Sequence, residues 1–398
     1  MFLYYLLAVV ACWLGLLSLR GGLRFASYVR HETSLPLPDF HPFVSVIAPS
    51  RGLEAGLIEN IRPLLDQDYP AYEVLLVFDS GDDPALVLVQ NLLSAQQTAR
   101  IVIAGPATDS GQKVHNLRVA VGEVDPRCEV LVFVDTDARP NREWLKQLVA
   151  PLHDESLGAS TGYRWFVPQR GGLASRLRSV WNASIASALG AATAKNFCWG
   201  GSTAIRHAIF DRLNVRERWR GSVSDDYTIT GCLKEAGLPV HFTPNCLVAS
   251  VGDCDFRELL EFTTRQIKIT RVYAPHLWQP LLLGSSLFTI VFFGGLTLLL
   301  LRIVLGRSFL ILLALLGLVW ALGAAKALIR WRAICIPLAD HLPALRRDLT
   351  AQIVLWPFAS VLYLYNAIAA GFSQRIEWRG ITYELKSPNE AVIISRNS

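Results

Sequence analysis

The sequence contains little charge and no recognisable cysteine pattern. Of its 398 residues 52% are hydrophobic and only 18% are charged, and the mean hydropathy is +0.33. This balance is too apolar for an ordinary soluble protein and too charged for a pure transporter. The seven cysteines are scattered without a C-x-x-C pair. This argues against a disulfide framework or a zinc site and favours a reduced, cytoplasmic domain.

Two further absences narrow the functional classes. No G-x-G-x-x-G follows the first predicted strand, so the common dinucleotide-binding fingerprint is missing. The net charge of +5 is modest, and the basic clusters flank apolar runs, which gives no support to nucleic-acid binding. The sequence does not predict an oligomeric state.

Long apolar runs are present near both ends of the chain and predict a multi-pass integral membrane protein. The runs are residues 2–19, 281–301, 309–325 and 351–372. The first run lacks a preceding basic segment and is followed by Arg20, Arg24 and Arg30, as expected for an uncleaved anchor whose downstream side is cytoplasmic. The predicted organisation is an anchor (1–20), a cytoplasmic catalytic domain (40–275), a C-terminal membrane region (279–372) and a tail (373–398).

Two membrane features have alternative interpretations. Four full crossings would place the tail on the side opposite the catalytic domain, whereas a tail that packs on this domain requires one re-entrant or interfacial span. Residues 176–195 are rich in Ala, Ser and Leu, with Trp181 inside and basic residues near the ends. This segment is either a buried core helix or a helix lying in the membrane surface.

Strands and helices alternate in the first part of the central region. Apolar β-type runs at 44–49, 73–78, 101–104 and 130–134 are separated by helical patterns at 54–66, 85–95 and 113–121. This βαβαβαβ order predicts an α/β fold with a mostly parallel sheet and right-handed crossovers.

Asp135 and Asp137 follow the last of these strands. The carboxyl ends of parallel strands are where open α/β sheets bind ligands. Two carboxylates spaced two residues apart suit a shared Mg²⁺ or Mn²⁺ that also holds substrate phosphates. The alternative is that Asp137 only caps a helix.

Three other groups of polar residues accompany this pair, and each has a simpler structural explanation. Asp79 ends the second strand, and the simpler explanation is that it initiates a turn. Asp225 and Asp226 lie at the start of a predicted helix that Gly237 closes, and the simpler explanation is that Asp225 caps this helix. Arg265 and Lys268 lie just before the membrane region, and the simpler explanation is that they are solvated or contact lipid headgroups.

As an ordered set, these motifs resemble the family 2 glycosyltransferases, within them the ceramide glucosyltransferase-like branch. The matching strings are 77–84 (VFDSGDDP), 111–117 (GQKVHNL), 134–137 (VDTD), 200–204 (GGSTA), 224–227 (SDDY) and 376–383 (IEWRGITY). The resemblance covers nearly the whole chain and implies the glycosyltransferase A-type fold, which binds a nucleotide sugar.

The resemblance also implies how the donor is bound. Asp79 would contact the uracil or ribose of a UDP-sugar. Asp135 and Asp137 would hold the metal, Mg²⁺ or Mn²⁺, together with the diphosphate, and Lys113 would assist at the nucleotide.

The remaining roles implied by the resemblance concern catalysis. Asp226 would be the general base, with Asp225 in the place of the family's usual Glu at the donor site. The family's last motif, Gln/Arg-x-x-Arg-Trp, is altered here: Arg265 and Lys268 keep the charges, but Ile269 replaces the Trp. Lys268 offers phosphate a point charge without the bidentate geometry of Arg.

The sequence therefore predicts a hexosyltransferase in the lipid bilayer. It would move a hexose from a nucleotide-diphosphate sugar, UDP-glucose or similar, to a membrane lipid hydroxyl such as that of ceramide. One base and no covalent intermediate imply inversion and a β-glycolipid. The alternatives are a hopanoid or other lipid acceptor, a processive polysaccharide synthase, and a catalytically silent membrane scaffold.

Overall fold

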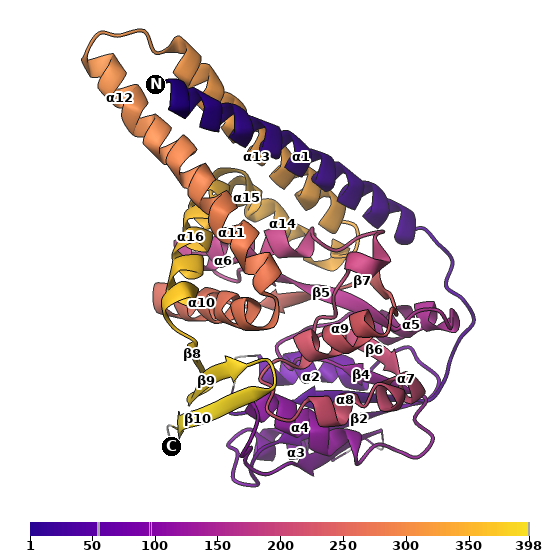
Figure 1. Cartoon of the computed structure of the whole chain (residues 1–398). Coiled ribbons are helices and arrows are strands. Elements are labelled where there is room, and N and C mark those ends of the chain that lie inside the picture. The colour runs from indigo at the N-terminus through magenta and orange to yellow at the C-terminus, as the bar shows by residue number, and fades with distance from the viewer. Residues whose placement is uncertain (54–55, 95, 97, 397–398) are drawn as a thin grey trace. The chain divides into compact units, whose positions relative to one another are not determined.

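The computed structural model describes residues 1–53, 56–94, 96 and 98–396. The chain forms two compact units. The sheet unit comprises His31–Val167, Leu189–Gly252 and Gln374–Ser398, and the helical unit comprises Met1–Arg30, Pro168–Ala188 and Asp253–Ser373. Figure 1 shows the elements of each unit, most of them labelled.

The core of the sheet unit is a seven-stranded sheet in the order β3-β2-β1-β4-β6-β5-β7. Its strands are β1 (Val44–Pro49), β2 (Tyr72–Phe78), β3 (Ala99–Ile103), β4 (Val130–Phe133), β5 (Ala159–Val167), β6 (Thr203–Arg206) and β7 (Val240–Val251). β6 pairs antiparallel with both of its neighbours, and the other pairs are parallel. The predicted α/β fold with a mostly parallel sheet is confirmed.

Helices cover the sheet because its central strands are apolar on both faces. They are α2 (Leu57–Leu65), α3 (Leu86–Leu93), α4 (Gln112–Val121), α5 (Trp144–Val149), α7 (His207–Arg212), α8 (Val215–Arg218) and α9 (Asp225–Glu235). Phe133 of β4 contacts Phe210 and Trp219 in the core, with ring centroids 6.0 and 5.4 Å apart. The predicted helices at 54–66 and 85–95 correspond to α2 and α3; Glu54, Ala55 and Ala95 lie outside the described residues.

Gly162 interrupts the pairing of β5 with β7. The register shifts between Thr161 and Tyr163, and a Cβ at Gly162 would lie 2.0 Å from the backbone oxygen of Cys246. Only glycine permits so close an approach of two backbones. The bulge sets the direction in which the second half of β5, including Arg164, continues along the sheet.

The chain ends in an antiparallel three-stranded sheet that belongs to the sheet unit. Its strands are β8 (Arg375–Trp378), β9 (Ile381–Ser387) and β10 (Glu390–Arg396). Tyr383 of β9 is buried, and its Oη accepts a hydrogen bond of 3.1 Å from the backbone N–H of Gln112 in α4. The tail therefore packs on the sheet unit, which is the case that the sequence left open.

The helical unit contains α1 (Phe2–Glu32) up to Arg30, one helix between β5 and β6, and the helices that follow β7. They are α6 (Leu173–Ala186), α10 (Phe256–Tyr273), α11 (Pro275–Thr289), α12 (Gly295–Val304), α13 (Leu310–Ile334), α14 (Leu342–Arg347), α15 (Leu349–Val354) and α16 (Trp356–Phe372). A π-helical turn, Ile290–Gly294, joins α11 to α12.

Among the described residues, three helices are long and apolar enough to cross a membrane: Phe2–Glu32, Pro275–Val304 and Leu310–Ile334. The fourth predicted span, 351–372, is not one helix. It divides at Leu355 into α15 and α16, because Pro357 in the first turn of α16 lacks the N–H that a continuous helix would use. Neither piece is among the candidate spans of the described residues.

The predicted helix at 176–195 begins earlier and is shorter than expected, since α6 ends at Ala186. Trp181 is fully buried and stacks on Tyr363 of α16 at a ring distance of 4.8 Å. Its indole ring thus contributes to the core of the helical unit. Placement of this helix in a membrane surface stays a prediction.

Candidate functional site

The carboxyl ends of three neighbouring parallel strands supply polar side chains to one edge of the sheet. Arg51 follows β1, Asp79 comes directly after β2, and Asp135 lies two residues after β4. Asp79 forms an ion pair with Arg51, whose Nε lies 3.4 Å from Oδ2 of the carboxylate. The Asp79 side chain is therefore held by an ion pair, and Arg51 is a candidate site residue that sequence reasoning missed.

Lys113 links two of the predicted carboxylates. Its Nζ lies 2.7 Å from Oδ1 of Asp135 and 3.1 Å from Oδ1 of Asp225. Lys113 stands in the first turn of α4, and Asp225 begins α9. Since the Gly111 N–H donates to the Ser222 carbonyl at 2.8 Å, the two helices start side by side. A strand end and two helix starts thus converge on one ammonium group.

Arg164 of β5 joins the two carboxylates of the Asp135–Asp137 pair. Its Nη2 lies 2.8 Å from Oδ2 of Asp135, and its Nη1 lies 3.0 Å from Oδ2 of Asp137. The sequence carries no local signal for this residue, because an arginine within a strand resembles a solvent-facing position. Asp137 does not cap a helix, since α5 begins only at Trp144 with Glu143 at its N-cap.

Asp226, the predicted base, lies in the first turn of α9 and is partly exposed. Its Oδ1 accepts a 2.8 Å hydrogen bond from the backbone N–H of Tyr227 and a second one from the hydroxyl of Ser224. Ser224 is the N-cap of this helix. Asp225 is therefore not the cap that the simpler interpretation required, and its side chain is used in the ion pair with Lys113.

The pKa values reflect this charge arrangement. Burial alone would raise the pKa of Asp135, but the charges of Lys113 and Arg164 hold it below its usual value. The pKa of Asp225 is raised to about 6 because the carboxyl is buried, an effect that Lys113 opposes and Asp226 adds to. Burial lowers the pKa of Lys113, yet Asp135, Asp225 and Asp226 together raise it above normal. Lys113 is thus a largely buried cation at neutral pH.

The C-terminal tail adds a further cation. Arg379, in the turn between β8 and β9, has a left-handed backbone with φ of 48° and donates a hydrogen bond of 2.8 Å to the carbonyl of Arg51. Its charge is among those that lower the pKa of Asp135. Arg379 lies in the string 376–383, which matched the family in sequence, but the sequence gave no residue of this string a role. Contact between positions so far apart along the chain has no local sequence signal.

Arg265 and Lys268 belong to the helical unit, where both lie on α10. Arg265 forms an ion pair with Glu261 one turn earlier, at 3.3 Å. Burial lowers the pKa of Lys268. The aromatic ring of Trp278 in α11 is covered by the guanidinium of Arg271 at 5.2 Å. The roles of Arg265 and Lys268 at the donor stay predictions.

The Asp135–Asp137 pair fits a divalent cation that the substrate helps to hold. Oδ1 of Asp137 is buried and has no hydrogen-bond partner within the described part of the chain. No cluster of three or more His, Cys, Asp or Glu side chains suited to a metal occurs among the described residues. Two carboxylates are nevertheless a usual protein contribution to Mg²⁺, with phosphates and water completing the shell.

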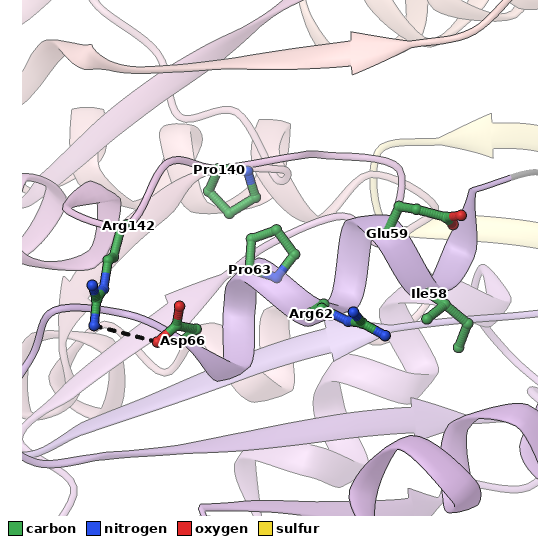
Figure 2. Close-up of a pocket in the computed structure, with 7 residues that line it drawn as sticks. All are labelled: Ile58, Glu59, Arg62, Pro63, Asp66, Pro140 and Arg142. Carbon is green, nitrogen blue, oxygen red and sulfur yellow. Dashed lines mark ion pairs between the residues drawn. The ribbon is translucent and has the colours of Figure 1, made fainter. Parts of the chain in front are cut away.

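A surface pocket of about 530 Å³ lies beside α2, apart from these residues. Figure 2 shows its lining, which is Ile58, Glu59, Arg62, Pro63, Asp66, Pro140 and Arg142. It contains an ion pair of 3.5 Å between Arg142 and Asp66, whose side chains are both largely exposed. Such a pair contributes little energy. None of the predicted site residues lines this pocket.

Two solved structures resemble parts of the fold. A mannosyltransferase from Pyrobaculum calidifontis, in complex with GDP-Man and Mn²⁺, gives a TM-score of 0.47 at 19% identity over 92% of this chain and 98% of that one. Glucosyl-3-phosphoglycerate synthase from Mycobacterium tuberculosis gives 0.37 at 17% identity over 61% and 89%.

Sequence comparisons give the family. Ceramide glucosyltransferase 1 of Caenorhabditis elegans is 20% identical over 262 residues, 64% of this chain and 55% of the relative. Ceramide glucosyltransferase 3 of the same organism is 31% identical over 94 residues, 23% of this chain and 19% of the relative. The chain thus matches about half the length of the first relative and less of the second. The sequence model described as glycosyl transferase family 21 matches residues 3–391. The resemblance to ceramide glucosyltransferases is confirmed, and the chain belongs to glycosyl transferase family 21.

Proposed function

We propose that this protein transfers a hexose from a nucleotide-diphosphate sugar, UDP-glucose or a similar donor, to a membrane lipid hydroxyl, with inversion at the anomeric carbon. The observation that supports this most is the network in which Lys113 contacts both Asp135 and Asp225 while Arg164 contacts Asp135 and Asp137. The relatives' name, ceramide glucosyltransferase, supports glucose as the sugar and a ceramide-like lipid as the acceptor.

The leaving diphosphate must be stabilised as the bond from the sugar C1 to its oxygen breaks. Lys113 and Arg164 are largely buried cations, with side chains 13% and 11% exposed, at the edge where the diphosphate would lie, so they can stabilise the developing charge with little reorganisation of solvent. Asp135 and Asp137 would hold Mg²⁺ or Mn²⁺, which supplies further charge neutralisation when bound. Asp79 and Arg51 would bind the nucleoside end.

The acceptor hydroxyl must lose its proton as its oxygen attacks C1. Asp226 would accept that proton, since it lies in the first turn of α9 next to Asp225 and is partly exposed. The Ser224 hydroxyl and the Tyr227 N–H hold its Oδ1, which fixes the orientation of the carboxylate. Attack on the face opposite the leaving group converts an α-linked donor into a β-glycoside.

A product analysis tests this function. Purified full-length protein in detergent, supplied with a UDP-hexose, Mn²⁺ and a lipid extract, should give a glycolipid that carries one added hexose, identified by mass spectrometry. NMR of the product should give a β anomer. An α anomer would contradict inversion, and a polymer would identify a processive synthase. UDP binding without turnover of any donor would identify a scaffold.

We also propose that the catalytic part and the tail share the cytoplasmic side of the membrane. One candidate span precedes the first part of the sheet unit, and two lie between Gly252 and the tail. An even number of crossings returns the tail to the same side, where Tyr383 packs on Gln112.

A protease-protection experiment tests this topology. One epitope tag is inserted after Glu155, in an exposed turn of the sheet unit, and another is attached at the C-terminus. Both tags should be digested in inside-out vesicles and protected in right-side-out ones. Protection of only one tag in either preparation would contradict the proposal.

A further inference from the structure

Arg164 occupies the carboxylate oxygens that a divalent cation at the Asp135–Asp137 pair would need. The guanidinium spans the pair, with one nitrogen on Oδ2 of each carboxylate at 2.8 and 3.0 Å. The second oxygen of Asp135 is taken by Lys113 at 2.7 Å. A metal ion that bridges the two carboxylates must therefore displace Arg164 or share its oxygens.

The position of Arg164 is built into the fold. Its side chain is only 11% exposed, and its guanidinium lies 4.7 Å from the ring centroid of Trp199 and 5.5 Å from that of Phe166. Trp199 is itself packed closely, because a Cβ on Gly201 would lie 2.3 Å from its ring. Stacking on two aromatic faces orients a guanidinium and strengthens its interaction with the partly dehydrated carboxylates.

We propose that Arg164 is an internal competitor of the metal ion, which weakens metal binding until a nucleotide diphosphate arrives. This inference rests on the proposed function, since it assumes that Asp135 and Asp137 bind the metal. A metal ion alone must break the contacts of Arg164 and leave a largely buried cation without its carboxylates. A diphosphate offers the displaced guanidinium a negatively charged, bidentate partner in place of the two carboxylates. Metal and nucleotide therefore bind cooperatively, and each strengthens the other by the same factor.

The experiment measures Mn²⁺ binding by titration calorimetry and by electron paramagnetic resonance, on the full-length protein, with and without UDP. Arg164→Gln removes the competing charge, so its Mn²⁺ affinity without nucleotide should rise about tenfold, and the factor by which UDP strengthens Mn²⁺ binding should fall about fivefold or more. Arg206→Gln is the matched control, because Arg206 lies on the adjacent strand β6 and bonds to the Leu157 carbonyl. It should leave both quantities unchanged.

The outcomes separate this inference from the proposed function. If the Asp137→Asn variant binds Mn²⁺ as tightly as the wild-type protein does, the metal site itself is wrong. If that variant binds Mn²⁺ more weakly while Arg164→Gln leaves the affinity equal or lower, only the competitor role is overturned. If the Gln variant does not fold, Arg164→Lys tests the competitor role instead. Lysine keeps the charge but cannot bridge both carboxylates, so intermediate Mn²⁺ affinity and intermediate cooperativity support the inference, and wild-type values overturn it.

Discussion

Asp226→Asn is expected to lower the rate of hexose transfer by about 10²- to 10⁴-fold. The amide cannot accept the proton of the acceptor hydroxyl. Its oxygen can still accept the hydrogen bonds that Tyr227 N–H and the Ser224 hydroxyl give to Oδ1 of the aspartate. The start of α9 should therefore keep its structure while the reaction loses its base. Steady-state kinetics with a UDP-hexose and a lipid acceptor measure the change, and calorimetry should give UDP binding close to that of wild type.

The control for this prediction is Asp211→Asn. Asp211 is a largely exposed aspartate on α7 of the same unit, paired with His207 at 3.7 Å. Its loss should leave the rate within the error of the wild-type measurement, because weak exposed pairs contribute little. A wild-type rate in the Asp226 variant would assign the base to another group. Loss of UDP binding would mean that Asp226 binds donor.

Gly200→Ala is expected to lower the rate by about 10²-fold through displaced side chains at the site. A Cβ at this position would lie 2.0 Å from Oδ2 of Asp225 and 2.9 Å from Nζ of Lys113. Asp225 is buried, so it has no solvent-filled space into which to move. Its displacement disturbs Lys113, which also contacts Asp135. Steric crowding by the site side chains therefore explains why glycine occupies positions 200 and 201.

Gly231→Ala provides the matched control for this steric argument. Gly231 lies in the same helix as Asp225, and a Cβ there would meet no atom within 4 Å. Alanine in a helix interior is favoured over glycine by about 1 kcal/mol, so this variant should unfold at a slightly higher temperature and keep its rate. Kinetics and thermal unfolding of both variants give the comparison. A Gly200 variant with full activity would show that the Lys113 contacts are not needed for transfer.

Local signals in the sequence were sufficient for the first half of the sheet. The predicted strand at 44–49 coincides with β1, and three further strands agree with β2, β3 and β4 to within a few residues. Buried parallel strands are continuous apolar runs, which are visible in the sequence without knowledge of their partners. The same reasoning placed Asp79, Asp135 and Asp137 at strand ends.

One of the four predicted membrane spans is divided in the structure by a local interruption. Residues 351–372 are apolar enough for a span, but the break before Pro357 divides them into two short helices. The mean hydropathy of a window of residues does not reveal such a break, because it takes no account of the backbone N–H that proline lacks. The other three predicted runs, 2–19, 281–301 and 309–325, lie within or largely within the three candidate spans of the structure.

The cations of the site show the limit of sequence reasoning most clearly. Lys113 was expected from a family motif, but Arg51, Arg164 and Arg379 were not assigned to the site. Arg164 reaches Asp135 because a glycine bulge and the pairing of β5 with β6 and β7 set the course of its strand. Arg379 reaches the carbonyl of Arg51 because the C-terminal strands pack on α4.

The sequence by itself determined the family, the α/β class and the carboxylates, because hydrophobic periodicity and short motifs are properties of neighbouring residues. Only the tertiary structure decided which cations meet those carboxylates and on which unit the tail lies. Ion pairs such as Arg164 with Asp135 join residues on different strands, and their formation depends on strand order and register. Neither is encoded in the spacing of residues along one segment.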